Sequence, residues 1–549
     1  MNNLDQLLSS VVAGDLSRRD FMARAAALGV GAVALSQMAN ALDAHAERAM
    51  SGLNTLTLNA VQVFGNIDPA IGNDYTQQMA QINFYDSLLA ATAGAGVKPL
   101  LADHFTASPD AKVFTVVLKK GIKFHSGTEL TADDVVYSMQ RALTIASTPA
   151  AVWQGVLKPA GVKALDRYTV RFTLEQAFAP FPNTLPGLYI LDKTLVASHH
   201  KSGKYGANGD YGTAFLANNE AGSGPYTLES DVEGSELKMK KFPGYFRGWH
   251  ANSIDEIRVL IVTADATVIS LAKTGVLDMT SQFQGIPAYT TLKNLGFKLF
   301  TAPTETVFYL KMNMALAPTD DIHVRRAIAL AFDYNTTRTR LLPGAPVNGP
   351  LAPIFKDAYN GSLPAIQQNL TAAKAELAKS KYAGKGAIPL TFSYVTGSSF
   401  EAQIGLLFNS VMSSIGFKVT LNPLPWNRIT EIAAKSSTTP NVTEVFYGVT
   451  YPSPDAMFFV QYDSKSAGTW ASMEWFNDPQ VDSLIAQSRV TVDTAKRNAL
   501  YKQIQARIVA LQPDVFVLAQ LFQQAVRPSV TGLQYIPAAQ YQFYNLSKS

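Results

Sequence analysis

The 549-residue sequence contains no cysteine, which excludes disulfides, thiolate nucleophiles and cysteine-ligated zinc or iron–sulfur sites. Charged residues are scarce at 16%, whereas 47% of the residues are hydrophobic, and this balance argues against a disordered chain. A net charge of +4 without a long basic run gives no support for nucleic-acid binding. No segment reaches 18 consecutive apolar residues, so no permanent membrane span is expected. The length exceeds what one hydrophobic core usually serves, which predicts more than one compact unit.

The first residues have the pattern of an export signal. The pair Arg18-Arg19 precedes an uncharged run over 25–34 that is short and poor in large side chains. The segment resembles a twin-arginine signal, with departures at the last two motif positions, and small-x-small cleavage sites end at Ala41 and at Ala46. We therefore expect residues 1–46 to be a removable signal and the mature protein to be periplasmic. An ordinary amphipathic N-terminal helix is the alternative.

Patterns of strands and helices alternate through the rest of the chain. Residues 169–175 alternate between apolar and polar side chains, which predicts a strand with one wet face. Residues 257–262 are continuously apolar and predict a strand buried on both faces. Apolar residues at helical spacing predict helices over 131–143 and 500–511, the second of which stops before Pro513. The fold class is therefore mixed α/β.

Signatures of catalysis are scarce. The sequence has no His-Glu-x-x-His, no Gly-x-Ser-x-Gly and no phosphate-binding loop. The adjacent histidines at 199 and 200 suit a solvated loop better than a metal site. The pairs Asp133-Asp134 and Asp320-Asp321 precede helical stripes, so helix capping is a better interpretation than acid–base catalysis. We expect no catalytic residue, no metal and no cofactor, which favours a binding protein over an enzyme.

One long motif and several short ones carry a family resemblance. The long motif covers residues 99–135, PLLADHFTASPDAKVFTVVLKKGIKFHSGTELTADDV. The short motifs are GSGPY at 222–226, YFRG at 245–248, VRRAI at 324–328 and NDPQVD at 477–482. Together they resemble the solute-binding proteins of ABC importers for peptides, nickel and related solutes, the oligopeptide- and dipeptide-binding family 5. Within the long motif, Gly121 is expected to supply the turn of a hairpin.

The resemblance implies a two-lobed periplasmic-binding-protein fold of type II, in its large peptide-binding class, with an extra subdomain on the first lobe. The first lobe is expected at 47–302 plus 515–549 and the second lobe at 303–514. Such a protein encloses a small-molecule or peptide-like ligand and docks transiently on the transmembrane subunits of an ABC permease. The resemblance thus implies a monomer that meets the membrane only by docking to the permease.

Peptide binders of this family anchor the ligand's α-amino group with an aspartate of the second lobe. In this sequence Thr450 stands at that position, and a hydroxyl does not compensate a buried ammonium. Asp455 replaces the anchor only if the loop is shifted. The sequence therefore favours a small organic or modified-peptide solute over an ordinary oligopeptide.

Aromatic residues and one arginine complete the candidate site. By resemblance or by their place next to predicted strands, the aromatic candidates are Phe64, Trp153, Tyr189, Trp426, Tyr447 and Tyr451. Each aromatic side chain could instead pack in a core. Arg428 is the candidate for pairing an anionic group, with a surface salt bridge as an equal alternative.

Two other functions remain open at this point. Nickel binders of the family use an arginine in the region that matches residues 185–189, where this sequence has Gly187, which weakens a nickel or metallophore reading. A periplasmic hydrolase is the alternative from a different class. It predicts turnover of a substrate, whereas a binder releases its ligand unchanged.

Overall fold

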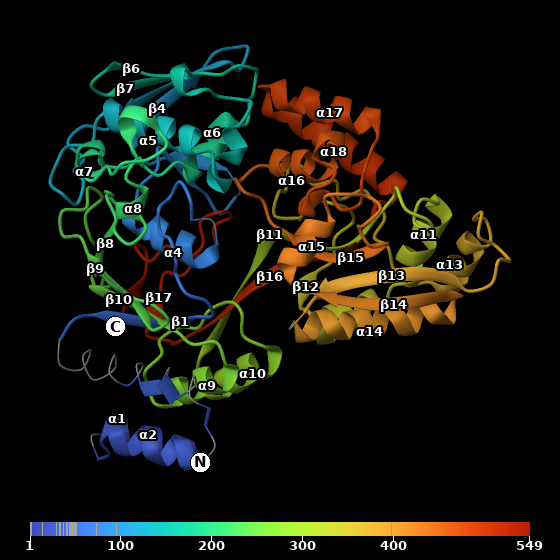
Figure 1. Ribbon diagram of the computed structural model, residues 1–549, viewed down its shortest axis with the longest axis horizontal. Helices are drawn as coiled ribbons and strands as arrows, with labels where there is room; N and C mark the ends of the chain where they lie inside the picture. The colour runs from blue at the N-terminus through green and yellow to red at the C-terminus, as the bar shows by residue number, and fades with distance from the viewer. Residues whose placement is uncertain are drawn as a thin grey trace.

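A computed structural model of the chain describes residues 52–549 except 73, 95 and 397, and within the first 51 residues it describes 3–13, 15–28, 30, 31, 35, 36, 38, 39 and 42. Two lobes are joined by two long strands, β11 (Lys298–Met312) and β16 (Asp514–Val526) (Figure 1). Among the described residues, no helix combines the length and hydrophobicity that a bilayer crossing requires.

The first lobe is built on a four-stranded sheet in the order β1-β10-β9-β8. Its strands are β1 (Thr55–Ala60), β8 (Tyr226–Val232), β9 (Glu236–Lys241) and β10 (Glu256–Ile261). The helices α4 (Tyr75–Phe84), α9 (Asp265–Lys273) and α10 (Ile286–Asn294) belong to the same lobe, and so does the short pair β17 (Val530–Thr531) and β18 (Ser547–Lys548). β1 runs parallel to β10 and is buried along its whole length, as expected for a strand covered on both faces.

A subdomain extends the first lobe around a second sheet, in the order β4-β5-β7-β6. The strands of the subdomain are β2 (Leu89–Ala91), β3 (Val97–Pro99), β4 (Ala102–Ala107), β5 (Val113–Leu118), β6 (Val162–Asp166) and β7 (Thr169–Thr173). Its helices are α5 (Ala132–Ile145), α6 (Phe181–Thr184), α7 (Lys193–Ser198) and α8 (Thr213–Leu216). Buried and half-buried residues alternate along β5, which places one face of this sheet on a core.

The second lobe contains a six-stranded sheet in the order β12-β16-β11-β15-β13-β14. Its other strands are β12 (Gly344–Ala345), β13 (Ile388–Val395), β14 (Phe417–Leu424) and β15 (Val442–Tyr447). Its helices are α11 (Ile322–Ala331), α12 (Tyr334–Thr336), α13 (Leu370–Leu377), α14 (Ser399–Ser414), α15 (Trp426–Ile432), α16 (Pro454–Tyr462), α17 (Pro479–Val490) and α18 (Thr494–Leu511).

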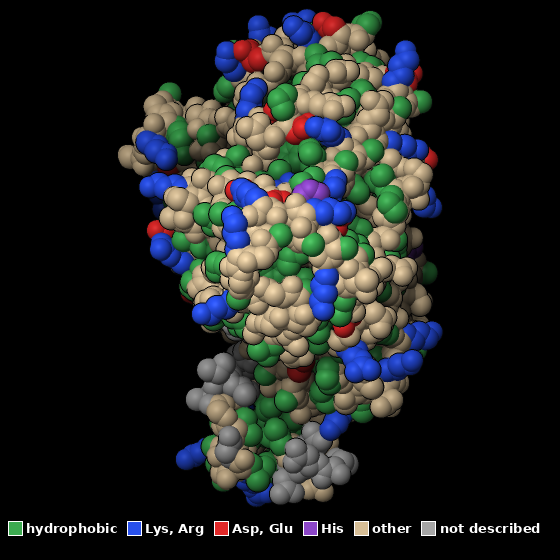
Figure 2. Space-filling model, turned by 90° about the vertical axis from the view of Figure 1, so that its right-hand side faces the viewer, with side chains coloured by type: hydrophobic (Ala, Val, Ile, Leu, Met, Phe, Trp, Pro, Cys, Tyr) green, Lys and Arg blue, Asp and Glu red, His purple; other side chains and the backbone are tan. Residues whose placement is uncertain are grey.

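Alternating residues of the central strands divide the core of the second lobe in two. Phe308 and Leu310 of β11 pack with residues of α11, α13 and α14 on one face. Val307 and Tyr309 pack with residues of α16 and α18 on the other. At the outer end of this lobe, Lys and Arg side chains are spread over the surface among hydrophobic ones (Figure 2).

The two crossing strands connect the sheets of the lobes directly. At their first-lobe end Lys298 pairs with Val526, and bridges run from there through Met279 to Leu58 of β1. The antiparallel register shifts between Pro303 and Val307, where the strands pass from one lobe to the other. This irregularity marks the place at which the pair can bend.

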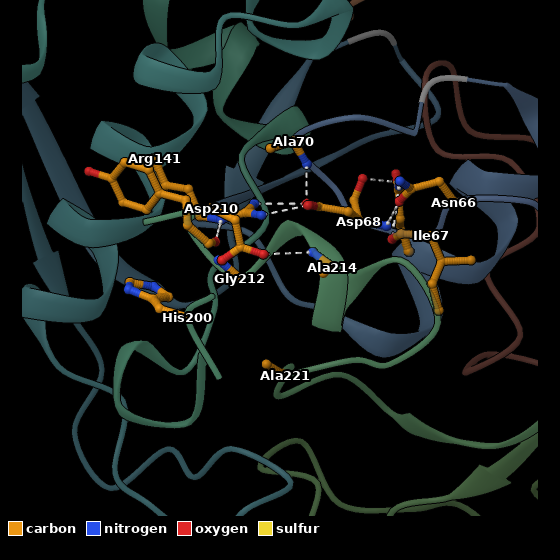
Figure 3. Close-up of polar contacts among 12 residues, drawn as sticks. Asn66, Ile67, Asp68, Ala70, Arg141, His200, Asp210, Gly212, Ala214 and Ala221 are labelled. Carbon is orange, nitrogen blue, oxygen red and sulfur yellow. Dashed lines mark hydrogen bonds and ion pairs between the residues drawn. The ribbon is translucent and has the colours of Figure 1, made fainter. Parts of the chain in front are cut away.

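A buried ion pair fastens the subdomain to the first-lobe sheet (Figure 3). Arg141 of α5 donates from Nη1 and Nη2 to the two carboxylate oxygens of Asp68, at 2.7 and 2.5 Å, and from Nε to the carbonyl oxygen of Tyr211 at 2.7 Å. Asp68 Oδ1 also accepts a hydrogen bond from Ala70 N at 2.9 Å. The planar guanidinium therefore forms a bidentate pair with a buried carboxylate, the geometry that arginine favours.

The GSGPY motif at 222–226 lies against the end of α4. A Cβ atom at Gly222 would come within 1.9 Å of the carbonyl oxygen of Phe84, so only glycine fits there. His125 joins the subdomain to this motif, because its backbone N donates to the carbonyl oxygen of Gly222 and its Nε2 lies 2.9 Å from that of Gly224. The motif is therefore part of the scaffold.

The structure confirms the predicted strands and helices and corrects one turn. Asp134 and Asp321 cap α5 and α11, as expected for the acidic pairs. The hairpin predicted at Gly121 is displaced: Gly121 adopts a left-handed φ of 76°, but the hairpin closes around Gly127, with Phe124 N donating to the carbonyl oxygen of Thr128. The segment holds two turn-forming glycines, and the first only bends the chain as it leaves β5.

The N-terminal helices α1 (Asn3–Val12) and α2 (Arg18–Ala27) pack mainly on each other. Leu8, Phe21 and Ala25 belong to a small cluster that shares no described residue with the clusters of the two lobes. Removing these helices therefore leaves the cores of the lobes intact.

Candidate ligand-binding site between the lobes

The carboxyl ends of three parallel strands form the edge of the second lobe that faces the crossing. β13 runs parallel to both β14 and β15. Tyr447 at the end of β15 pairs with Val307, next to the register shift of β11, so this edge points toward the first lobe. The carboxyl edge of parallel strands is where open α/β sheets place their ligands.

Two tryptophans are exposed on this edge. Trp426, which follows β14, and Trp470 expose 40% and 37% of their surface. Their rings meet edge to face at a centroid distance of 5.4 Å, and Trp470 also lies 5.8 Å from the ring of buried Tyr447. Apolar rings left open to solvent in this way provide a stacking surface for a ligand.

The first lobe presents an exposed aromatic residue of its own. Phe283 is 46% exposed and packs against Tyr75 with a centroid distance of 4.7 Å. Tyr75 is held near the carboxyl end of β1, because its hydroxyl oxygen accepts a hydrogen bond from Val61 N at 2.8 Å. Burial raises the pKa of Tyr75 to about 12, so its hydroxyl stays protonated at neutral pH. Among the exposed large hydrophobic side chains that the structure describes, only Phe283, Trp426 and Trp470 are aromatic.

The segment predicted to anchor a ligand amine is divided between surface and core. Thr450 is exposed. Asp455 is buried, accepts a hydrogen bond from Tyr451 and forms an ion pair with Arg489, whose Nη1 lies 3.1 Å from Asp455 Oδ2. Burial raises the pKa of Asp455, although the Arg489 guanidinium opposes the shift. Asp455 therefore already has a cationic partner within the protein.

The remaining predicted residues lie in several places. Trp153 is buried in the subdomain, where its Nε1 donates to Thr184 Oγ1 at 2.8 Å, and Phe64 is buried in the first-lobe core. Tyr189 is half-buried and lines a small hollow with Tyr75. Arg428 is exposed and pairs with Glu431 on its own helix at 2.6 Å.

The structure thus brings together only part of the predicted set. Trp426, Tyr447 and Thr450 lie at one strand edge, and Trp470 and Phe283 were missed by sequence reasoning. Neither missed residue follows a predicted strand directly, so no periodicity pointed to it. Exposure of a large ring is the signal that identifies both, and it requires coordinates.

Buried charges lie on the crossing strand β11. Glu305 accepts a hydrogen bond from Tyr535 of the first lobe, and burial raises the pKa of this carboxyl. Further along, Lys311 Nζ lies 2.9 Å from Glu474, and burial raises the pKa of Glu474 although the Lys311 ammonium opposes the shift. These pairs lie within the fold and fix the strand at the crossing and on its second-lobe side.

The adjacent histidines have separate partners. His199 stacks on Phe215 with a centroid distance of 4.0 Å, and His200 Nε2 lies 2.9 Å from the hydroxyl of Tyr137. Among the residues that the structure describes, no group of three potential metal-binding side chains is found. The two histidines therefore contact different aromatic residues of the subdomain, Phe215 and Tyr137, and the described residues do not join them in one set of metal ligands.

Comparisons with known proteins assign the family. The model of bacterial extracellular solute-binding proteins, family 5, matches residues 96–469. The chain is 27% identical over 493 residues to the probable D,D-dipeptide-binding periplasmic protein DdpA of Escherichia coli K12, covering 88% of this chain and 91% of the relative. It is 26% identical over 508 residues to the glutathione-binding protein GsiB of Shigella flexneri serotype 5b, covering 87% and 92%.

A solved structure supports the same fold. The ABC transporter substrate-binding protein CtaP of Listeria monocytogenes superposes with a TM-score of 0.78 at 20% identity, covering 90% of this chain and 99% of the other. The family model and the two-lobed architecture therefore agree over most of the chain. The chain belongs to family 5 of the bacterial extracellular solute-binding proteins, the substrate-binding components of ABC importers.

Proposed function

We propose that the chain binds a peptide-like or other small organic solute between two aromatic walls. Trp426 and Trp470 form the wall on the second lobe, and Phe283 with Tyr75 forms the wall on the first. Aromatic walls bury a ligand at low conformational cost and leave its orientation to a few polar groups. The exposure of these three rings, two at the carboxyl strand edge of the second lobe and one on the first lobe, is the observation that carries the proposal.

The second part of the proposal concerns the charge of the solute. Thr450 offers a hydroxyl where a carboxylate would hold a ligand ammonium, and Asp455 is paired with Arg489. An ammonium buried at this place would remain uncompensated, which costs several kcal/mol (order of magnitude). The solute is therefore one that does not bury a free α-amino group against this segment. The names of the two relatives, a D,D-dipeptide binder and a glutathione binder, support a small peptide-like solute as the class. Because those two ligands carry a free α-amino group themselves, its exclusion here rests on Thr450 and Asp455 alone.

Native mass spectrometry tests the proposal directly. The protein is purified without refolding, and any solute it retains is released by denaturation and identified. A stoichiometric mass without a free α-amino group is expected, whereas a mixture of ordinary short peptides would contradict the proposal. The double variant W426A/W470A should lose the solute. The control V232A, at an exposed site on the β8–β9 hairpin, should retain it.

We propose further that residues 1–46 are a twin-arginine-type signal, cleaved after Ala41 or Ala46, and that the mature protein works in the periplasm. The separate packing of α1 and α2 supports this, because cleavage removes no part of either lobe's core. The intact mass of the exported protein identifies the cleavage site. Replacing Arg18 and Arg19 by lysine should block export, and export at the wild-type level would contradict the twin-arginine route.

The proposed lobe limits are 47–302 plus 515–549 for the first lobe and 303–514 for the second. The register shift of β11 at Pro303 to Val307 supports the limit at 302/303. The opposite point on β16 lies at Ala519 to Leu521, a few residues after the proposed limit at 514/515, because residues 514–518 pair with β11 inside the second lobe. We also propose that the protein acts as a monomer that docks transiently on the permease. Analytical ultracentrifugation at micromolar concentration should give one species of the monomer mass.

A further inference from the structure

A second set of contacts joins the lobes away from the aromatic walls. The segment 178–184, which ends in α6 of the subdomain, lies against α16 and α17 of the second lobe (Figure 1). Ala179 N donates to the carbonyl oxygen of Arg489 at 2.8 Å, and Asn183 Nδ2 donates to that of Pro452 at 2.9 Å. Both hydrogen bonds run from the first lobe to backbone atoms of the second.

The side chain of Arg489 lies at the centre of these contacts. Its guanidinium carbon is 4.5 Å from the ring centroid of Phe178, in the first lobe, and 3.8 Å from that of Phe459, in the second. The same group is paired with Asp455, which is fully buried. The guanidinium is thus held in place by second-lobe residues and presents its free face to an aromatic ring of the first lobe.

These contacts are continuous with an apolar interface. Phe178 and Phe181 of the first lobe belong to the same cluster of buried residues as Tyr451 and Phe458 of the second. Each contact joins one protein group to another, so the set contributes to closure whatever the solute is. We call the set of Phe178, Ala179, Asn183, Pro452 and Arg489 the interlobe latch.

We propose that the interlobe latch sets the equilibrium between open and closed lobes, and that Arg489 is a positioning residue that tunes affinity without touching the solute. A solute that is enclosed only by the closed form is bound in proportion to the fraction of molecules that can close. Strengthening the latch raises that fraction, and weakening it lowers the affinity for every solute by the same factor. The proposal stands on the contacts between the lobes and does not depend on the nature of the solute.

The test weakens the latch from the first-lobe side, which leaves the Asp455–Arg489 pair intact. The variant F178L/N183A removes one ring contact and one hydrogen bond while keeping an apolar side chain in the core. The matched control is F297L/N219A. Phe297 stacks on Arg527 at 4.6 Å and Asn219 bonds to the carbonyl oxygen of Phe215, and both contacts lie within the first lobe.

Closure is measured by single-molecule fluorescence transfer between dyes on two introduced cysteines. The natural sequence has none, so L165C on β6 and L406C on α14, both exposed, label specifically. Each protein is unfolded, dialysed free of small molecules and refolded before measurement. F178L/N183A should lower the ratio of closed to open molecules by about tenfold relative to wild type, from the loss of one hydrogen bond and one cation–π contact.

The control variant should keep the wild-type ratio. Equal ratios for F178L/N183A and wild type would overturn the proposal, and so would an equal loss in the control. R489K provides a second test, because lysine keeps the charge for Asp455 but loses the planar stacking on Phe178. R489K should give a ratio of closed to open molecules between those of wild type and F178L/N183A, and its backbone amides in 178–184 and in the C-terminal turn of α17 should exchange hydrogen faster than those of wild type. Exchange at the wild-type rate in both segments would contradict the proposed role of the interlobe latch.

Discussion

Replacing Asp68 by asparagine tests whether the buried pair with Arg141 fastens the subdomain to the first lobe. Asparagine keeps the size of the side chain and an oxygen that can accept from Ala70 N. It removes the negative charge that the Arg141 guanidinium faces, and it replaces the oxygen that accepts from Arg141 Nη2 by an amide nitrogen that can only donate. D68N should therefore leave the shape of the site intact and leave a buried cation without a counter-ion.

The expected magnitude follows from the burial of the pair. The side chains of Asp68 and Arg141 are 0% and 1% exposed, so water cannot replace the lost partner. Removing one member of a buried ion pair costs about 3–5 kcal/mol in free energy of unfolding. The double variant D68N/R141M removes the orphaned charge as well, and it should recover a large part of that loss.

Urea unfolding followed by circular dichroism measures these free energies. The matched control is E175Q, which breaks the pair between Glu175 and Lys158, whose side chains are 44% and 70% exposed. Exposed pairs contribute within about 1 kcal/mol, so E175Q should change the midpoint little. The reasoning is refuted if D68N costs no more than E175Q, or if D68N/R141M is less stable than D68N.

Three further predictions follow from single residues. Thr450→Asp should bind tripeptides with a free N-terminus at least about tenfold more tightly than the neutral control Thr450→Asn. Equal dissociation constants of the two variants in calorimetric titrations would refute the inference that Thr450 excludes a ligand ammonium. Burial lowers the pKa of His125, but contacts of its ring nitrogens with Glu220 and with the Gly224 carbonyl raise it overall. The stability that His125 contributes should thus be lost as pH rises above the ordinary value of 6.5, and urea midpoints of H125Q should show a weaker pH dependence. Burial also raises the pKa of Glu444, whose carboxyl oxygens have no hydrogen-bond partner among the described residues. Wild-type stability should therefore fall above pH 4.5 more steeply than that of E444Q.

The elements of the fold were predictable where a local pattern decided them. The strand over 169–175 and the helix over 131–143 appear where hydrophobic periodicity places them, because one face of each packs on a core. The turn at Gly121 was misplaced because two glycines compete for the hairpin, and their choice depends on which strands pair. Pairing of this kind is a tertiary property that a local pattern does not contain.

The candidate site was predictable only where it adjoins a predicted strand or matches the family's anchor segment. Trp426 follows the end of β14, and a strand end is visible in the sequence, whereas Thr450 was identified by the resemblance and lies just beyond β15. Trp153 has the same residue type as Trp426, but its ring is buried and its Nε1 is satisfied by Thr184. Whether a tryptophan packs in a core or faces a ligand depends on neighbours from distant parts of the chain, and residue type alone leaves both outcomes open.

The roles of Thr450 and Asp455 are linked by the latch. Arg489 and Tyr451 both bind Asp455 Oδ2, and Oδ1 has no hydrogen-bond partner among the described residues, so a ligand ammonium at Oδ1 would share the carboxylate with Arg489. Sharing one negative charge between two cations weakens the pair that fixes the guanidinium beside Phe178, and with it a contact that holds the lobes together. Recognition of an ammonium by Asp455 and closure through Arg489 therefore oppose each other. A chain that uses this carboxylate to hold its lobes closed is better suited to a solute that brings no positive charge to the same place.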